Sequence, residues 1–345
     1  MISEMEKTIR ITSKPRDLKE GLFGQVLLFV FEVLPYLEER GLMPDWAIRS
    51  KLYGNPDNDY LVIPGLLELN YKCVASEFGH QTLRLKRLRR FATTTLGNDW
   101  QYLNRLLFKY FRIPQRILDR ADAYPKLDNA LGLHYRGTDK NKSSNETNYV
   151  SEDDFMMLAK DLLSTLPDVT TIFIASDERC FVEKMQTAHP TYEILSSGEV
   201  VHHKNLKDQD NFAKGDHAML DCLLLSRCKH LMKCQSALSG FAKVLNPEID
   251  AYRISANKLA PWAPETPYFP DAYLPRYQSE NPECREILDR LFEEDWTLNQ
   301  SVVEQYGQLF GYKERRIQFQ GDMLSRIVHG LSGRFQSSKI GNPFK

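Results

Sequence analysis

The feature that most constrains the fold is a regular alternation of short apolar runs and helical segments between residues 129 and 254. Its clearest member is Thr170 to Ala175, TTIFIA, a continuous run of the type found in strands buried on both faces. We expect strands at 129–135, 170–175, 192–195, 230–234 and 249–254, with helices between them. Strands that alternate with helices form parallel, right-handed, doubly wound sheets, so the sequence predicts an α/β fold.

The chain is also predicted to contain more than one domain, because its 345 residues are enough for two separate cores. Residues 1–128 carry strand and helix signals of their own and are expected to form an N-terminal α/β half. Residues 129–280 are expected to form the second, Rossmann-like half, and residues 281–345 are expected to form C-terminal helices that pack back on the body. Within the first half, residues 83–91 are expected to form a helix with a solvated basic face, and residues 98–120 another helix.

Composition and motifs exclude several classes of function. The formal net charge of −1 gives no global field that would attract nucleic acid. No CxxC pair is present, and His202, His203 and His217 are too loosely spaced for a zinc site. The glycine-rich motifs of nicotinamide enzymes and P-loop NTPases are missing. Asp208-Gln209-Asp210 spells a DxD pair, but it lies in a long loop of the second half, which argues against a metal-dependent transferase.

The same sequence predicts a cytoplasmic location. The six cysteines are scattered and several lie in apolar stretches, as expected of buried thiols in a reducing compartment. The N-terminus is charged and resembles no secretory signal, and the longest apolar run, Val26 to Leu34, is too short to span a bilayer. The C-terminal tail is basic. We expect it to fray while the apolar stripe before it packs on the body, with a weak membrane-surface contact as the alternative.

The strand at 129–135 ends in a polar loop that no core strand requires. His134 and Arg136 lie at alternate positions and therefore point to one side of the strand end. Arginine suits bidentate phosphate contact, Gly137 lets a ligand approach the backbone, and Lys140 adds a second positive charge. A diphosphate leaving group needs fixed cations of this kind.

The attacking hydroxyl in such a reaction needs a carboxylate base. Glu146, Asp139 and Asp177 are the candidates by their positions near the strand ends. The alternative is a purely structural loop in which Arg136 and Asp139 neutralise each other.

The peptide at 134–140, HYRGTDK, resembles the H-x-R-x-T-D-K motif of the α-1,6-fucosyltransferases. The wider superfamily includes the nodulation fucosyltransferase NodZ and the protein O-fucosyltransferases. Three further peptides resemble this family in the same order: IASDE at 174–178, HPTYEI at 189–194, and the helix at 215–226 that contains Asp221. The resemblance covers about residues 129–250.

The resemblance implies a GT-B architecture, in which two Rossmann-like domains face a cleft and the C-terminal one holds a GDP-sugar. It also implies inversion at the sugar carbon, with no metal and no cofactor besides the GDP-fucose donor. Arg136 matches the arginine on the β-phosphate, His134 the histidine of the donor pocket, and Asp221 the aspartate that accepts hydrogen bonds from guanine. The alternative is that Asp221 is an acidic residue on the helix surface with no role in binding.

Two positions depart from the family pattern. Ser236 and Ser239 match serines of its phosphate-contacting peptide, but the glutamine position is Leu238. The spacing of the family's base lands on Ser144, and Glu146 fits only if the loop is two residues longer.

In the first half, Gly24 belongs to a glycine turn before an apolar helix. Such a turn can bind an anion, although a plain turn is the commoner case.

The sequence thus predicts an inverting transferase that moves fucose from GDP-fucose to a hydroxyl of a glycan or glycoconjugate. The residues singled out hold GDP and not the sugar, so another GDP-sugar remains an alternative. A second alternative is a non-catalytic module of the same fold that binds a GDP-sugar or a glycan.

Overall fold

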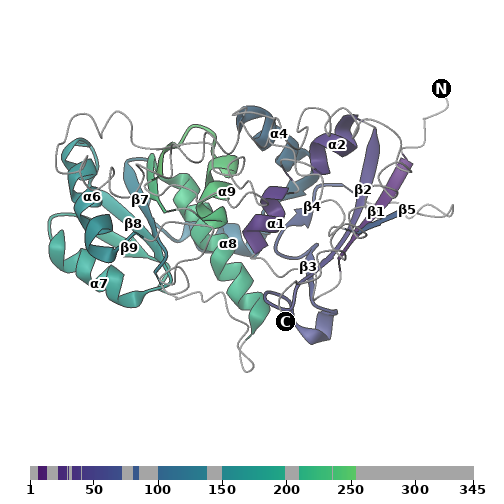
Figure 1. The fold of residues 1–345 in the computed structure, drawn as a ribbon, viewed down its shortest axis with the longest axis horizontal. Coiled ribbons are helices and arrows are strands. Elements are labelled where there is room, and N and C mark those ends of the chain that lie inside the picture. Colours follow the sequence, from purple (N-terminus) through teal and green to yellow (C-terminus); the bar gives the residue numbers. More distant parts are fainter. Residues whose placement is uncertain are drawn as a thin grey trace, which may run out of the picture. The chain divides into compact units, whose positions relative to one another are not determined.

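The computed structural model describes residues 7–13, 22–28, 30, 33–39, 41–71, 81–84, 100–137, 150–198, 210–234 and 236–253. The described residues contain two larger sheets, one before residue 85 and one after residue 129. The predicted α/β fold class is confirmed by these sheets and the helices beside them (Figure 1). The domain boundaries at 128 and 280 stay predictions, and the C-terminal helices expected at 281–345 lie outside the described residues.

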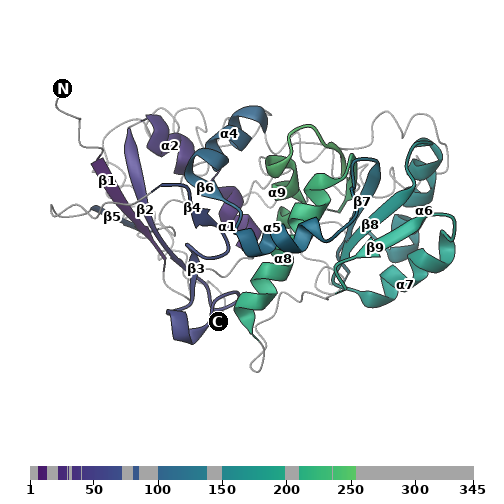
Figure 2. The same ribbon diagram turned by 180° about the vertical axis from the view of Figure 1, so that it is seen from behind.

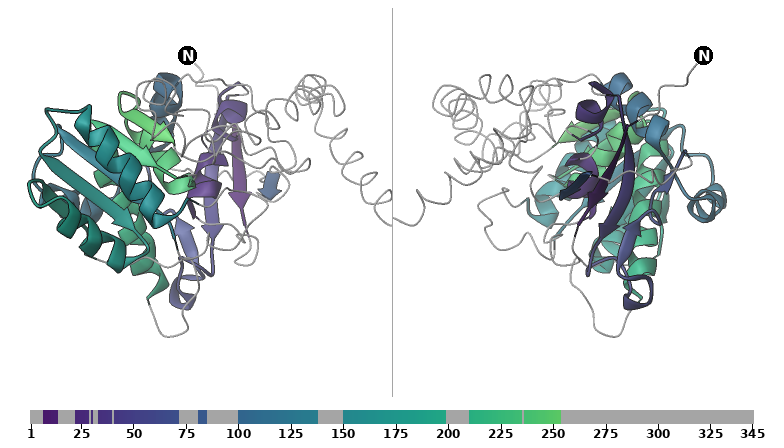
Figure 3. Two further views of the ribbon diagram at one scale, coloured as in Figure 1. Left: turned by 60° about the vertical axis from the view of Figure 1, so that its left-hand side comes forward. Right: turned by 90° about the vertical axis from the view of Figure 1, so that its right-hand side faces the viewer.

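The sheet of the second half has five strands in the order β11-β10-β7-β8-β9, and every neighbouring pair is parallel. Its strands are β7 (Ala130–Tyr135), β8 (Thr171–Ser176), β9 (Glu193–Ser196), β10 (His230–Lys233) and β11 (Asp250–Arg253). The connecting helices are α6 (Glu152–Ser164), α7 (Arg179–Ala188), α8 (Asn211–Arg227) and α9 (Ala237–Leu245). Each predicted strand of this half is therefore present (Figure 3).

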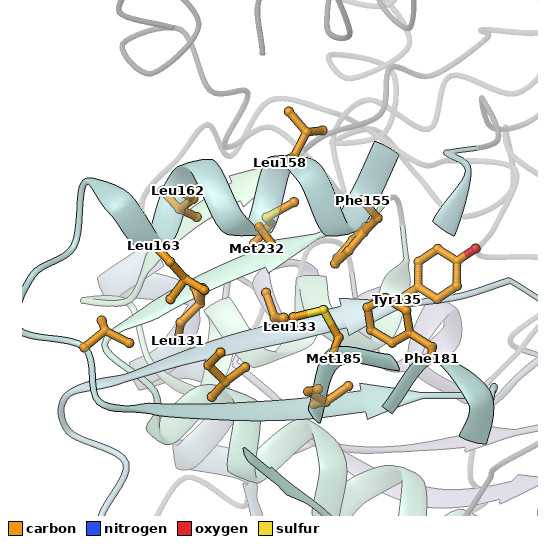
Figure 4. Packing of buried hydrophobic residues seen from close by; sticks show 14 of the residues in the cluster. Leu131, Leu133, Tyr135, Phe155, Leu158, Leu162, Leu163, Phe181, Met185 and Met232 are labelled. Carbon is orange, nitrogen blue, oxygen red and sulfur yellow. The ribbon is translucent and has the colours of Figure 1, made fainter. Parts of the chain in front are cut away.

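One face of this sheet is covered by α6 and α7 over a closed apolar core. Figure 4 shows Phe155 and Leu163 on the side of α6 that faces Leu131 and Leu133 of β7. At the end of β7, the ring of Tyr135 stacks on Phe181 with centroids 4.5 Å apart and meets Phe155 edge-on at 5.2 Å. Aromatic packing of this kind fixes the strand end from which the polar loop departs.

The opposite face of β7 receives α8 at very short range. A Cβ built on Gly132 would lie 3.1 Å from Cδ2 of Leu225 and 3.2 Å from Sγ of Cys228. A Cβ at these distances would force the side chains of Leu225 and Cys228 to shift by a few tenths of an ångström, so glycine at this position permits the close approach of α8 to β7.

The sheet of the first half has the order β3-β2-β1-β5. Its strands are β1 (Lys7–Thr12), β2 (Leu42–Arg49), β3 (Leu61–Ile63) and β5 (Gln81–Arg84). Strands β2 and β5 pair in parallel with β1, whereas β3 pairs antiparallel with β2. A two-stranded ribbon pairs β4 (Glu68–Leu69) with β6 (Phe111–Arg112).

The helices of the first half are α1 (Leu22–Leu28), α2 (Leu34–Glu39), α4 (Trp100–Tyr110) and α5 (Gln115–Asp122). Seen from behind, α5 runs beside α8 of the second half (Figure 2). Arg116 of α5 is bound there to Asp216 of α8 through two hydrogen bonds of 2.7 and 2.8 Å. A further link joins Asn55 to Asp210, the N-cap residue of α8.

Two sequence predictions for the first half were wrong in detail. Within the stretch 98–120, which was expected to be one helix, the described residues from 100 onward form two helices, because β6 pairs with β4 between them. The helix expected from residue 83 does not begin there, because residues 81–84 form β5 and pair with β1. Both errors come from strand pairings with partners distant in sequence. The remainder of the expected basic helix lies outside the described residues.

Among the described helices, none is long and apolar enough to cross a membrane. The cysteines at positions 180, 222, 228 and 234 are free thiols, and burial raises the pKa of the last three.

Substitution of Gly132 tests the close packing of α8 on β7. Gly132→Val should lower the free energy of unfolding by about 1–3 kcal/mol, because the added methyls meet Leu225 and Cys228. Urea unfolding measures this difference. Gly24→Ala is the control, since no atom lies within 4 Å of the added Cβ and alanine favours the helix. A Gly132→Val protein as stable as the parent would contradict the observed packing.

Candidate functional site

The order of the strands singles out one edge of the second sheet. The chain builds β7, β8 and β9 in one direction and then returns through α8 to place β10 on the other side of β7. The strand order therefore reverses between β7 and β10. In open α/β sheets, ligands bind outside the carboxyl ends of the strands at such a switch point.

His134 and Lys233 stand at this switch point as direct neighbours. They are paired in the register of β7 with β10, so their side chains point to the same face of the sheet. His134 is 6% exposed and Lys233 is completely buried. Arg136 follows two residues after His134, just beyond the end of β7, and is half-buried. Two cationic side chains and one histidine are thus concentrated at the carboxyl edge.

The electrostatic surroundings keep the ring of His134 uncharged. Burial, followed by the positive charges of Arg136 and Lys233, lowers the pKa of His134 to about 3. His134 is therefore neutral at physiological pH, and the positive charge at this edge comes from the arginine and lysine side chains.

Asp221 reaches the same region from α8. It shares a helix face with Leu225 and Cys228, the two residues that meet Gly132 of β7. Asp221 precedes Leu225 by one helical turn, about 6 Å along the axis. His134 follows Gly132 by two strand residues, also about 6–7 Å. Because a crossover helix runs antiparallel to its strands, Asp221 lies at the level of His134, and it is 5% exposed.

The N-terminus of α9 supplies the third wall of the site. Ser236 is its N-cap residue and is 5% exposed, and no side-chain capping bond involves it in the described structure. Ser239 is completely buried, and its Oγ lies 2.8 Å from Nδ1 of His134. The structure therefore brings Ser239 against the histidine of β7.

On the other side of β7, two carboxylates lie beside the first residues of the polar loop. The backbone N–H of Gly137 donates to Oδ1 of Asp177 at 3.0 Å. A Cβ on Gly137 would lie 2.3 Å from Oε1 of Glu178, so a side chain at this position would displace the Glu178 carboxylate. Burial, and then the charges of Asp177 and Glu152, raise the pKa of Glu178.

Several predicted site residues can now be placed. Arg136 and Asp177 lie at adjacent strand ends, and Lys140, Glu146 and Asp139 lie outside the described residues. The placement expected for Gly24 was wrong: α1 begins at Leu22, so Gly24 lies inside a helix of seven residues and not in a turn before it. That helix packs on α9, with the rings of Phe23 and Phe241 5.9 Å apart.

Sequence reasoning missed Lys233 and Glu178 as members of this edge. Lys233 ends an apolar strand, HLMK, where a buried lysine is unusual and could have served as the signal. Glu178 directly follows the predicted strand-end aspartate, and its approach to Gly137 depends on the fold.

One group of side chains near β8 has atoms close enough to hold a metal ion. The ligand atoms of Glu152, Glu178 and Cys180 lie within 4.8 Å of one another. The amine of Lys184 already forms an ion pair with Glu152 at 3.0 Å, which places a cation beside the carboxylates. The expected independence from metal stays a prediction.

The structure is similar to solved fucosyltransferases. The NodZ α-1,6-fucosyltransferase co-crystallised with GDP has a TM-score of 0.46 and 16% identity, over 70% of this chain and 93% of that chain. The apo form of POFUT1 has a TM-score of 0.44 and 10% identity, over 72% of this chain and 98% of that chain. A mutant of Arabidopsis thaliana FUT1 in complex with GDP has a TM-score of 0.42 and 9% identity, over 77% and 74%. No family model matches the sequence, and no curated protein matches it.

The depressed pKa of His134 predicts a pH dependence of stability. A pKa near 3 in the folded state lies below the usual 6.5, so the unfolded chain binds more protons between these values. The stability contributed by neutral His134 is complete above pH 6.5 and is lost as the pH falls. Between pH 6.5 and 5 the loss should be about 2 kcal/mol.

Urea unfolding at these two pH values, on the parent and on His134→Gln, measures this contribution. The variant should lose less stability on acidification, because glutamine binds no proton. An equal loss in both proteins would show that His134 is protonated in the folded state.

Proposed function

We propose that this protein is a glycosyltransferase that binds a GDP-sugar at the carboxyl ends of β7 and β10. It transfers the sugar, most simply fucose, to a hydroxyl of a glycan or glycoconjugate with inversion. The GT-B architecture, independence from metal and a cytoplasmic location belong to the same proposal.

One observation carries this proposal. The H-x-R peptide that resembles the fucosyltransferase motif ends the strand at the topological switch point, where α/β sheets bind their ligands. Arg136, just beyond the end of that strand, is proposed to contact the diphosphate, while buried Asp221 lies at the level of His134 on the same side of the sheet. A nucleotide needs both elements, a cation for its phosphates and an acceptor for its base.

The reaction is a single displacement. The acceptor oxygen forms a bond to the anomeric carbon while the bond from that carbon to the β-phosphate oxygen breaks, and GDP leaves with the electron pair. Arg136, assisted by Lys140, stabilises the negative charge that grows on the diphosphate. Asp221 and His134 hold the nucleoside, and Ser236 is a further predicted donor contact.

The proton of the acceptor hydroxyl goes to a carboxylate. Glu146 and Asp177 are the predicted candidates for this base. The position of Asp177 supports this role. It lies just after β8 and accepts a hydrogen bond from the backbone N–H of Gly137, next to Arg136. The same hydrogen bond equally suits a group that positions the loop.

The alternative is a module that binds a GDP-sugar or a glycan without catalysis. Calorimetry with GDP and an assay for transfer and donor hydrolysis separate the two. Binding with neither reaction would favour the module. The donor sugar follows from the same assay run with several GDP-sugars.

Arg136 provides the first test of the proposal. Arg136→Ala should weaken GDP binding about 10- to 100-fold, because hydrogen bonds between charged groups are lost. The affinity of Arg136→Lys for GDP should lie between those of the parent protein and Arg136→Ala, since a lysine cannot form the bidentate contact. Calorimetry gives the dissociation constants. Arg227→Ala is the matched control, because this arginine ends α8 at the opposite edge, where it pairs with Asp122. Undiminished binding and transfer by Arg136→Ala would refute the assignment.

Asp221 provides a test of base recognition. In a thermal-shift screen, GDP compounds should stabilise the protein and UDP or ADP compounds should not. Asp221→Asn should reduce GDP affinity about 10- to 100-fold, because an amide cannot accept from both guanine N–H groups. Asp119→Asn, on the exposed surface of α5, is the control. A parent protein that prefers UDP compounds would end the proposal of a GDP site.

A further inference from the structure

The contact between His134 and Ser239 joins two elements that are 105 residues apart in the chain. Nδ1 of the ring lies 2.8 Å from Oγ of Ser239, and both side chains are buried. The same Oγ lies 3.3 Å from the carbonyl oxygen of Ser236, one turn earlier. A chain of three polar atoms thus runs from the ring to the first turn of α9.

The positions of the protons along this chain follow from its chemistry. The carbonyl oxygen of Ser236 can only accept, and it already accepts from the N–H of Gly240 at 3.0 Å. If the Ser239 hydroxyl donates to this carbonyl, its oxygen is left to accept from Nδ1–H, and both contacts are hydrogen bonds. If the hydroxyl donates to Nδ1 instead, two oxygen lone pairs face each other at the second contact. The first arrangement satisfies every atom.

The charge state of the ring completes the description. Arg136 from its own strand and Lys233 from β10 disfavour a second proton on His134, as does burial. Ser239 of α9 brings no charge, and Asp221 is the acidic residue of α8 at this level. A neutral ring with its proton on Nδ1 carries a bare lone pair on Nε2. No hydrogen bond to Nε2 is formed by the residues that the structure describes.

We propose that Ser239 is a positioning residue that holds His134 in the Nδ1–H form, so that Nε2 accepts a hydrogen bond from a hydroxyl or N–H group of the donor nucleoside. This inference rests on the proposed function for the identity of the ligand. It assigns His134 to recognition of a ribose hydroxyl or of the guanine edge and excludes it from the diphosphate, whose oxygens offer no proton. Ser239 acts through His134 and is not itself a phosphate contact.

The form of the ring can be observed without any nucleotide. In protein labelled with ¹⁵N-histidine, the His134 signals, assigned by their loss in His134→Gln, should show a pyrrole-like Nδ1 and a pyridine-like Nε2. Ser239→Ala should shift these signals toward the other tautomer. Ser226→Ala is the matched control. The hydroxyl of Ser226 donates to the carbonyl oxygen of Leu223, three residues earlier in α8, at 2.7 Å, and no histidine is involved. A pyrrole-like Nε2 in the parent protein would overturn the proposal, even if Ser239→Ala fails to fold.

The ligand group is identified by dissociation constants for GDP, 2′-deoxy-GDP, 3′-deoxy-GDP and inosine diphosphate. One of the three analogues should bind the parent about 3- to 15-fold more weakly than GDP, and His134→Ala should bind that analogue and GDP equally. The deoxy analogues report a ribose hydroxyl, and inosine diphosphate reports the guanine amine. Discrimination that persists unchanged in His134→Ala for all analogues would overturn the proposal. Failure of GDP to bind at all would instead refute the proposed function, while the ring signals would still report the tautomer.

Discussion

The parallel pairing of β7 with β10 is the interaction on which the rest of the described structure depends. It reverses the strand order, and it sets His134 beside Lys233 at the same level of the sheet. Close approach of α8 at Gly132 then brings Asp221 to that level. The aromatic contacts of Tyr135 on the other face fix the strand end before Arg136. Lys233 would lose its place beside His134 if β10 paired elsewhere.

The site combines buried charge with a histidine that remains neutral. Burying a lysine is costly, and placing it near an arginine adds repulsion. The same two charges suppress protonation of His134, so the cations and the histidine have separate tasks. In the proposed function, the positive charge serves the anionic part of the ligand, and the uncharged ring serves directional hydrogen bonding.

The sequence was sufficient to predict the strands of the second half, because buried parallel strands consist of short apolar runs such as TTIFIA. It could not reveal which strands are neighbours, and the position of Lys233 beside His134 follows only from that pairing. The strand at 81–84 was missed for the same reason. The role of Ser239 also depends on packing, since its contact with His134 spans two elements that no local pattern connects.

The long helix α8 has one further consequence. Near its beginning, Asp216 is fastened to Arg116 of the first half, and five residues later Asp221 faces the strands of the second half. A helix is stiff along its axis, so a displacement at one of these residues is carried to the other. A shift of the N-terminal half would therefore displace Asp221, where the nucleobase is proposed to bind. Under the proposed function, nucleotide binding at Asp221 would therefore be coupled through α8 to the position of the N-terminal half.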